Sequence, residues 1–520
     1  MKKIKSLKKV ILLTLVYIAF CNAQQQQHIP WPSLADSPWP FIRGDMQATG
    51  RSKYVGPSTN NVIWRKDMPL GIFYGPVIGY NDILYTGTSS VYSGGINFFY
   101  AIDKEGQNLW TFETESYFAN NIVPIIASDS TIYFGSRNRS IYALKPNGEL
   151  KWQIKNIVWG WVHGYMTIAK NGDLYVPSGD TLVIIDPGGI VKEKRTIEGL
   201  KGRSFIFSTG GDTIFYFTGG ADITEPGSLN AEKLDGELIW SYNFATHNLG
   251  APMVDNLNKI YVFGTDSTAA NNFFLYSINP DGTMNWRYKI NYYEYYSAPT
   301  MDKDGNVIFS TRTNSNMKNI IVSLDYYGNE NWISQLPGNF EESLIDHGLV
   351  CDAEGKIYCG STFAGYFYCL NSDGEILWTL DLEDYDYDTS PAIGSDGTLY
   401  IGTHQSSTFQ HHVRNLIAVR DTVTSVEGEN PGFLSYKLEQ NYPNPFNSIT
   451  NIRYTIPQSG RVTLKVYNLM GSEVATLLDR YQNTGSYDVI FQADGLSSGI
   501  YFYTLASGNY IATKKLILLK

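Results

Sequence analysis

Short apolar runs separated by polar turns make up most of the chain. The clearest copy is "SPAIGSDGTLYIGT", residues 390–403, where two apolar runs flank a Ser-Asp-Gly turn. Runs of this length bounded by turn residues predict β-strands, and helical periodicity is absent throughout the sequence. Equivalent runs are centred on Tyr85, Tyr133, Tyr175, Phe215, Tyr261, Ile308, Tyr358 and Tyr400.

A second pattern alternates with the first. It consists of an apolar run, an Asp/Asn-Gly turn and a tryptophan four residues after the glycine, as in "YCLNSDGEILW". Centres of the first pattern recur every 45 residues on average. That period, with about four short strands in each unit, predicts a β-propeller. The glycines of the second pattern are Gly106, Gly148, Gly189, Gly236, Gly282, Gly328 and Gly374, and in the third copy Glu193 replaces the tryptophan.

The two ends of the repeat region predict how the ring closes. No further copy of the tryptophan pattern follows Tyr400, but Trp64 lies 21 residues before Tyr85. The other outer positions precede their next inner position by 21 to 26 residues. We therefore expect the N-terminal strand to complete the last blade of an eight-bladed propeller, which removes two open sheet edges.

The repeated tryptophans predict a structural role. A flat ring at the end of each outer strand can wedge against the neighbouring blade, and its burial stabilises the fold. Of the eleven tryptophans, seven occupy this position and two lie in the N-terminal lead-in. Trp159 and Trp161 are the two that remain.

These repeats resemble the tryptophan-docking repeats of quinoprotein-like (pyrroloquinoline-quinone) eight-bladed propellers. The likeness covers roughly residues 31–421, including the lead-in "WPFIRGDMQATGRSKYVGP". The catalytic members of that family carry a vicinal disulfide beside the quinone, whereas no two cysteines are adjacent here. The resemblance thus implies the fold, and we expect neither bound pyrroloquinoline quinone nor dehydrogenase activity.

The first 23 residues read as a secretory signal peptide. Five lysines precede an apolar run from Val10 to Phe20, which is too short to span a bilayer, and small residues end at Ala23. Cys21 allows a lipoprotein interpretation, but the bulky Phe20 does not suit a lipobox. Removing the five lysines changes the formal net charge from −10 to about −15. That acidity argues against nucleic acid as a partner.

The repeat pattern ends at residue 421. A polar linker, residues 422–435, leads to strand-like alternation over residues 436–520. The motifs "NYPNPFN", "VYNLMG", "GLSSGIYFY" and the terminal "KKLILLK" resemble the C-terminal sorting domain of type IX secretion cargo. The resemblance implies an immunoglobulin-like β-sandwich and export across both membranes of a Gram-negative bacterium. We expect the domains 1–23, 24–421, 422–435 and 436–520.

Three cysteines remain after the signal peptide. Their odd number excludes a fully paired disulfide framework. Cys359 and Cys369 flank an expected hairpin and could pair, while three buried thiols, with Cys351, are the alternative.

Candidate ligand-binding residues gather in loops that join the outer strand of one blade to the inner strand of the next. Aromatic rings beside imidazoles and carboxylates suit a glycan or peptide. Alternatively, these rings could have the structural role of filling the mouth of the channel. The histidines could likewise be structural, hydrogen-bonded to loop carbonyls. The Asp triplet in one loop could hold Ca²⁺ or simply be solvated. The binding candidates are Trp159, Trp161, His163, His247, Tyr292, Tyr295, His347, Tyr385 and Tyr387, and the metal candidates are Asp384, Asp386 and Asp388.

The sequence contains no haem, zinc, EF-hand, Walker or nucleophile-elbow motif. It therefore favours a monomeric, non-enzymatic propeller, without a cofactor, that binds a glycan or protein at the cell surface or in the medium. A quinone-dependent dehydrogenase or a polysaccharide-degrading enzyme is one alternative. A scaffold for envelope assembly is another.

Overall fold

The structure is a computed structural model whose chain divides into two compact units, Met1–Thr422 and Val423–Lys520. It describes residues 25–69, 72, 75–88, 98–114, 122–136, 139–157, 166–201, 205–219, 226–245, 252–266, 273–290, 298–313, 318–337, 348–361, 365–382, 390–403, 415–421, 437–456, 460–482, 485–493, 495–508 and 510–519.

The described part of the first unit contains eight four-stranded antiparallel sheets and one 3-10 turn, η1 (Tyr80–Asp82). Seven sheets consist of four consecutive strands. The first four of these are β2 (Val77–Ile78), β3 (Leu84–Gly87), β4 (Phe98–Ile102), β5 (Asn108–Glu113); β6 (Ile122–Ile126), β7 (Ile132–Ser136), β8 (Ser140–Leu144), β9 (Leu150–Ile154); β10 (Thr167–Ile168), β11 (Leu174–Ser178), β12 (Thr181–Ile185), β13 (Val191–Thr196); and β14 (Ile206–Phe207), β15 (Thr213–Gly219), β16 (Gly227–Lys233), β17 (Leu238–Phe244).

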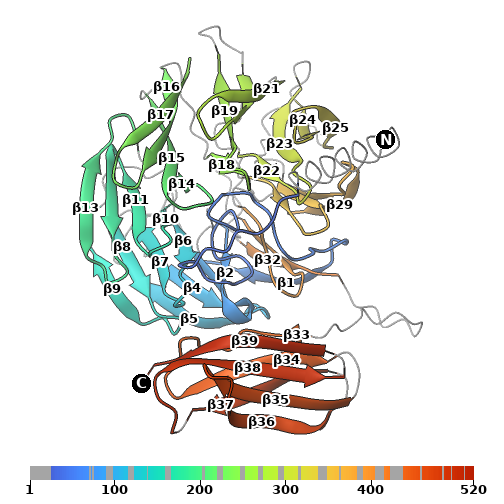
Figure 1. Ribbon diagram of the computed structural model, residues 1–520. Coiled ribbons are helices and arrows are strands. Elements are labelled where there is room, and N and C mark those ends of the chain that lie inside the picture. Colours follow the sequence, from blue (N-terminus) through green and yellow to red (C-terminus); the bar gives the residue numbers. More distant parts are fainter. Residues whose placement is uncertain are drawn as a thin grey trace, which may run out of the picture. The chain divides into compact units, whose positions relative to one another are not determined.

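The remaining sheets of this unit follow the same plan, and in Figure 1 all of them are arranged around a common centre in chain order. The all-β class is thereby confirmed. These sheets are β18 (Met253–Val254), β19 (Ile260–Thr265), β20 (Phe273–Ile278), β21 (Met284–Ile290); β22 (Thr300–Met301), β23 (Val307–Arg312), β24 (Asn319–Leu324), β25 (Glu330–Gln335); β26 (Val350–Cys351), β27 (Ile357–Gly360), β28 (Tyr366–Leu370), β29 (Ile376–Asp381); and β30 (Ala392–Ile393), β31 (Leu399–Gly402), β32 (Asn415–Val419) with β1 (Val62–Asp67).

The last of these sheets joins the two ends of the unit. β1 pairs antiparallel with β32, and Trp64 lies opposite Ala418. Beyond the strand, the Asp421 carboxylate accepts hydrogen bonds from the backbone N–H groups of Ser58 and Thr59. The pairing predicted for the N-terminal strand is confirmed.

Six tryptophans make the same contact with the next sheet. Each indole Nε1–H donates to the carbonyl two residues before the glycine of the next sheet, at 2.8 to 3.1 Å. That glycine has a φ between 82° and 88°, and a Cβ on it would lie 2.5 to 3.1 Å from the ring. The tryptophan and the following glycine therefore form one packing unit across each junction. The pairs are Trp64–Gly106, Trp110–Gly148, Trp152–Gly189, Trp240–Gly282, Trp286–Gly328 and Trp332–Gly374.

The seventh tryptophan meets the N-terminal segment instead. Trp378 donates to the Pro57 carbonyl at 3.3 Å, packs beside Tyr358 and Phe367, and is only 7 % exposed. It is the most deeply buried of the seven because the returning N-terminal segment covers it.

Arginine replaces tryptophan at the junction where the sequence has Glu193. Glu193 occupies the tryptophan register, opposite Ile184, but Arg195, two residues along the same strand, reaches the next sheet. Its Nη2 lies 3.4 Å from the Leu234 carbonyl, the equivalent acceptor. Its Nη1 forms an ion pair at 2.8 Å with Glu232, although the N–H is not aligned for a hydrogen bond. A charged contact has thus replaced an aromatic one at this junction.

We expect Arg195→Ala to destabilise the first unit by about 2 to 3 kcal/mol. Glu232 is 5 % exposed, and it would keep only the Tyr216 hydroxyl, 2.6 Å away, as a partner. Arg287→Ala is the matched control, since its ion pair with Asp266 is exposed and should contribute less than about 1 kcal/mol. Urea titration of both variants measures the difference, and equal shifts would show that Glu232 does not depend on Arg195.

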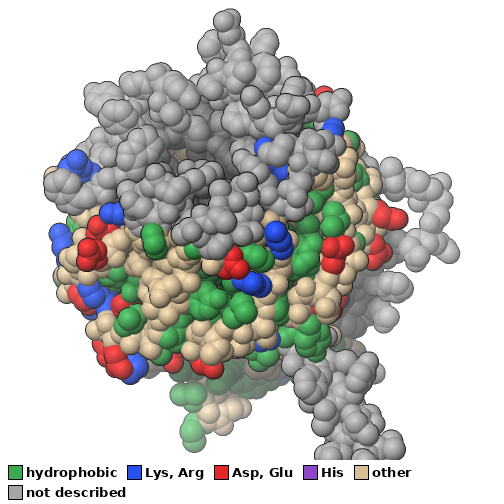
Figure 2. All heavy atoms as spheres, turned by 90° about the horizontal axis from the view of Figure 1, so that it is seen from above, with side chains coloured by type: hydrophobic (Ala, Val, Ile, Leu, Met, Phe, Trp, Pro, Cys, Tyr) green, Lys and Arg blue, Asp and Glu red, His purple; other side chains and the backbone are tan. Residues whose placement is uncertain are grey.

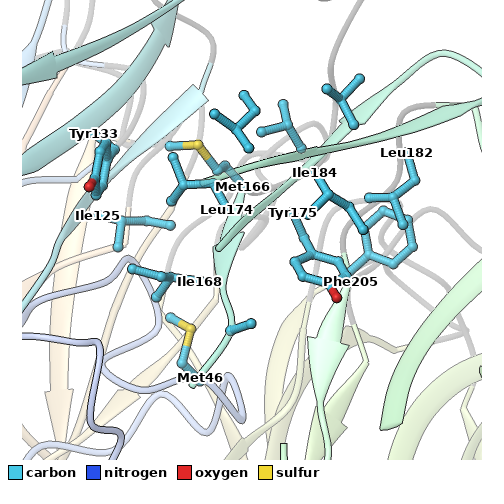
Figure 3. Close-up of a cluster of buried hydrophobic side chains, with 14 of the residues drawn as sticks. Met46, Ile125, Tyr133, Met166, Ile168, Leu174, Tyr175, Leu182, Ile184 and Phe205 are labelled. Atoms are coloured by element: carbon cyan, nitrogen blue, oxygen red, sulfur yellow. The ribbon is translucent and has the colours of Figure 1, made fainter. Parts of the chain in front are cut away.

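The core of the first unit lies within and between the sheets. Around β10 and β11, Ile168 and Leu174 pack with Ile125 of the preceding sheet and with Met46 from the N-terminal segment (Figure 3). Successive side chains of β11 and β12 point to opposite faces of their sheet, and nearly all of them are buried, so both faces of these inner strands pack against neighbours.

The three cysteines of the described residues, Cys351, Cys359 and Cys369, are free and buried. In the β27–β28 hairpin, Cys359 lies opposite Tyr368 and Cys369 opposite Tyr358. The two thiols therefore project to opposite faces of the sheet, which prevents a disulfide between them. Burial raises the pKa of the Cys359 thiol to about 12, which is the environment of an inert structural thiol.

The second unit has two antiparallel sheets around one core that includes Ile452, Leu464, Tyr503 and Leu518. One sheet has the order β33-β34-β37 and the other β36-β35-β38-β39. The strands are β33 (Lys437–Leu438), β34 (Ile449–Ile456), β35 (Gly460–Asn468), β36 (Glu473–Gln482), β37 (Gly485–Gln492), β38 (Gly499–Ser507) and β39 (Tyr510–Leu518).

Candidate functional site

The two ends of the first unit's sheets differ in how the strands are connected. At one end, here called the turn face, the first strand of a sheet turns into the second and the third into the fourth. These turns repeat one design: the Asp352 Oδ1 accepts the N–H groups of Glu354 and Lys356, and Asp325 does the same for Tyr327 and Asn329. Asp side chains favour such turns because they bond the backbone two residues ahead.

Buried carboxylates in these turns are structural. The Asp255 carboxylate accepts hydrogen bonds from the Tyr261 hydroxyl at 3.1 Å and the Tyr326 hydroxyl at 2.9 Å, and also from two backbone N–H groups. Burial raises the pKa of the Asp255 carboxyl, and these hydrogen bonds oppose the shift. The group is fully engaged in holding two sheets together, so it offers no free oxygen to a substrate.

The N-terminal segment from Gln26 to Pro57, here called the plug, lies across the turn face. Backbone hydrogen bonds join it to five of the sheets: Ala35 to Ile126, Trp39 to Ile78, Gln47 to Val254, Thr49 to Met301 and Gly50 to Cys351. In Figure 1 the plug is the dark blue segment at the centre of the ring. Contacts with so many sheets make the plug an integral part of the unit.

Arg43 anchors the middle of the plug. The side chain is 1 % exposed, and its guanidinium donates to the carbonyls of Leu349 at 3.1 Å, Pro299 at 2.6 Å and Ala48 at 3.4 Å. Guanidinium carries five donors in a rigid fork, which suits a cluster of carbonyls. Gly348 leaves room for it, because a Cβ there would lie 2.0 Å from Nη1.

Apolar side chains of the plug fill the centre of the ring at this end. Phe41, Ile42 and Met46 are each at most 3 % exposed and pack in the same cluster as Ile168. Figure 3 shows Met46 pointing toward Ile168 and Ile125. The turn face is therefore closed by protein atoms.

The opposite end, here called the loop face, has connections of unequal length. β11 ends at Ser178 and β12 begins at Thr181, whereas β31 ends at Gly402 and β32 begins at Asn415. The bases of three such connections are alike. In each, a hydroxyl accepts the N–H of the residue that starts the returning strand and donates to the carbonyl of that same residue. The hydroxyls are those of Thr88, Ser361 and Thr403. The same hydroxyl contact therefore occurs at the start of connections that differ in length.

The residues predicted to bind a ligand lie outside the described residues. The same holds for the candidate calcium ligands, the signal peptide and the linker, so all of these assignments stay predictions. The candidates concerned are Trp159, Trp161, His163, His247, Tyr292, Tyr295, His347, Tyr385, Tyr387, Asp384, Asp386 and Asp388.

Within the part of the chain that the structure describes, no group of three or more His, Cys, Asp or Glu side chains could hold a metal ion. No helix in that same part is long and apolar enough to cross a membrane. On the side of the molecule drawn in Figure 2, hydrophobic side chains lie in small groups among polar ones, and charges of both signs are dispersed. Leu238, Ile239 and Met284 are among the exposed apolar residues of the outer strands.

In the second unit, the "NYPNPF" segment lies along the end of the chain. The Asn444 Oδ1 accepts the N–H of Ile517 at 2.8 Å, and its Nδ2 donates to the Lys515 carbonyl at 3.3 Å. Phe446 continues this pairing through backbone bonds with Ile517 and Leu519. The first and last motifs of the unit are therefore one structural element.

The comparisons with known proteins agree with this division. Residues 440–519 match the family described as "Secretion system C-terminal sorting domain". No curated protein matches the chain. The match implies sorting to the type IX secretion machinery and export to the cell surface or medium.

Three solved structures resemble parts of this chain. BamB from Moraxella catarrhalis has a TM-score of 0.50 at 12 % identity, covering 69 % of this chain and 99 % of BamB. A protein of unknown function from Bacteroides caccae has a TM-score of 0.28 at 13 % identity, covering 42 % and 91 %. Dihydro-heme d1 dehydrogenase NirN in complex with DHE has a TM-score of 0.42 at 11 % identity, covering 84 % and 79 %. The likeness to BamB supports a propeller-like fold and concerns the fold alone.

Sequence reasoning missed the role of Arg43. The lead-in segment was recognised only as part of a family likeness, and no function was assigned to its residues. One signal was present: "PFIRGDM" places a lone arginine inside an apolar stretch that does not follow the repeat. A charged residue in such a stretch is either exposed or hydrogen-bonded to several polar groups. Arg43 is buried and bonded to three carbonyls.

Proposed function

We propose that the chain is an exported, non-enzymatic eight-bladed β-propeller whose loop face binds a glycan or a protein at the cell surface. In this proposal each four-stranded sheet of the first unit is one blade, and residues 24–421 form the propeller. Residues 1–23 are the signal peptide, residues 436–520 form an immunoglobulin-like sorting domain, and the mature protein is a monomer without cofactor. The route runs through the periplasm of a Gram-negative bacterium to the type IX secretion machinery.

The observation that carries the binding role is the contrast between the two faces. On the turn face, the turns have nearly the same length in every sheet, and the plug lies across them. On the loop face, hydroxyl-clamped bases support connections that differ in length and composition. A rigid scaffold with variable loops at one end is the usual arrangement of a binding surface. The sequence places Trp159 and Trp161, the two tryptophans without a role in the repeat, in one of these loops.

The double variant Trp159→Ala/Trp161→Ala tests the loop face. If both rings stack on a ligand, each contributes about 1 to 2 kcal/mol, so affinity should fall at least tenfold while the melting temperature changes little. A glycan array identifies the ligand, and titration calorimetry measures the loss. Trp378→Ala is the matched control: its buried ring should cost about 3 to 5 kcal/mol of stability. If the loop variant is destabilised as much as Trp378→Ala, its rings are part of the core and the binding face is wrong.

Reconstitution separates the enzyme alternatives. We expect no change in the absorbance spectrum, and no dye-linked oxidation of alcohols or sugars, when the protein is mixed with pyrroloquinoline quinone and Ca²⁺. Turnover in that assay, or release of reducing ends from polysaccharides, would replace the binding function with an enzymatic one.

Removing residues 436–520 tests the export route. The truncated protein should still fold, because the first unit has its own core, but it should be retained in the periplasm. Cell fractionation with antibody detection measures this, with a second type IX cargo in the same cells as the control. Normal amounts of the truncated protein outside the cell would contradict the type IX route.

A further inference from the structure

The sorting domain carries apolar side chains that its own core does not use. Leu469 and Met470, in the turn between β35 and β36, are 68 % and 88 % exposed, and Ile500 and Leu519 are 39 % and 54 % exposed. Their neighbours Val466, Tyr501 and Leu518 are buried in the core. Folding therefore explains why the neighbours are apolar but does not explain these four, which we call the apolar end.

The strand register brings the four residues to one end of the four-stranded sheet. Asn468 lies opposite Tyr501, and Gly499 lies opposite Leu518. The turn after β35, the start of β38 and the end of β39 are consequently at the same level, as the ribbon of this sheet in Figure 1 also shows. Phe446 fixes the last of these segments through its backbone bonds with Ile517 and Leu519.

The outward face of the same sheet is apolar near this end and mixed farther along, where Ile511 is 71 % exposed among polar side chains. Near the apolar end, half-buried Ile517 lies opposite Ile500, and half-buried Tyr467 lies opposite Phe502. Farther along, Thr504 bonds Thr513. Lys465 forms an ion pair with Glu473 at 2.8 Å near the boundary. Contiguous exposed apolar side chains beside a polar surface mark sites of protein–protein contact.

We propose that the apolar end is the surface by which a protein component of the export machinery recognises this sorting domain, through a complementary apolar surface. The proposal rests on the proposed type IX export. The four sequence motifs that carry the sorting-domain resemblance are far apart in the chain, yet each supplies a residue at or directly beneath this end: Phe446, Met470, Ile500 and Leu519. The recognition signal is thus a folded surface that both ends of the domain build, and not a linear C-terminal peptide.

The test uses the full chain with the double variant Leu469→Ser/Met470→Ser. Both side chains are largely exposed, so the melting temperature should stay within a few degrees of the parent while the exported fraction falls at least tenfold. Ile490→Ser is the matched control, because Ile490 is 73 % exposed on β37 of the other sheet, and it should be exported normally. Asn444→Ala is a second test variant. Loss of the Asn444 hydrogen bonds to β39 should reduce the exported fraction, although the C-terminal sequence is intact.

Each outcome has one meaning. Normal export of the double variant, with the chain truncated after residue 435 retained, would overturn the apolar end while leaving the export route in place. Normal export of the truncated chain would overturn the export route itself. Equal retention of Ile490→Ser would show that any exposed apolar residue matters, which also overturns the proposal. A large loss of stability in the double variant would show that another part of the protein, or a second copy, covers this end. That result would also overturn the proposal.

Discussion

A mature chain that begins at residue 67 is expected to fail to fold. Deleting residues 24–66 removes most of β1, which leaves β32 as an open edge, and it removes the whole plug. Open strand edges pair with other molecules, and the apolar surfaces that Phe41, Ile42 and Met46 cover would meet water. We expect aggregation in place of a monomeric product.

Size-exclusion chromatography and thermal melting measure this outcome. The matched control removes only residues 436–520, which should leave the first unit soluble and monomeric because the two units have separate cores. A second variant, Trp64→Ala, keeps both β1 and the plug and should lose stability without aggregating. Monomeric elution of the shortened chain with an unchanged melting temperature would refute closure by the N-terminal strand.

The repeats were predictable because each of them is a local feature. The turn, the glycine and the tryptophan lie within one short segment, and their recurrence indicates which positions have the same structural role. The pairing of β1 with β32 is a long-range contact, yet it could be predicted by counting the repeats. The last repeat lacks its outer tryptophan, and Trp64 precedes the first repeat, so the N-terminal strand was expected to complete the last sheet.

The features that the sequence did not predict depend on contacts between distant segments. Glu193 was recognised as a replacement for tryptophan, but the side chain that reaches the next sheet is Arg195, and only the strand register shows this. Arg43 depends on carbonyls about 250 and 300 residues away. For Cys359 and Cys369 the sequence left both redox states open, and the relative orientation of two strands decided between them.

The candidate site divides in the same way. Sequence reasoning identified which loops gather at one end of the ring, since that follows from strand order alone. It could not say how the side chains of those loops are placed, because placement depends on loop conformation, and no repeat constrains it. The closed turn face was likewise not foreseen, as it depends on a segment outside the repeat.

Gly328→Ala is expected to destabilise the first unit by about 2 to 5 kcal/mol, a large effect for one methyl group. Gly328 has a φ of +86°, and left-handed backbone costs a residue with a side chain about 1 to 2 kcal/mol. The new Cβ would also lie 2.6 Å from the Trp286 ring, and relieving such a contact adds about 1 to 3 kcal/mol. The rigid indole cannot turn away without losing its hydrogen bond to the Tyr326 carbonyl.

Gly355→Ala separates the two contributions. Gly355 has a similar φ of +91°, but its nearest neighbour would be Ser372 Cβ at 3.4 Å, an ordinary contact, so only the backbone cost of about 1 to 2 kcal/mol should remain. In a Trp286→Ala background the contact with the ring is absent, and Gly328→Ala should then cost no more than Gly355→Ala. Urea titration of the parent, the two single variants and the double variant should give a coupling of about 1 to 3 kcal/mol between the Trp286 ring and the Gly328 turn. A coupling near zero would mean that the tryptophan does not pack against the next sheet's turn, and the explanation of the repeated Gly-xxx-Trp pattern would have to change.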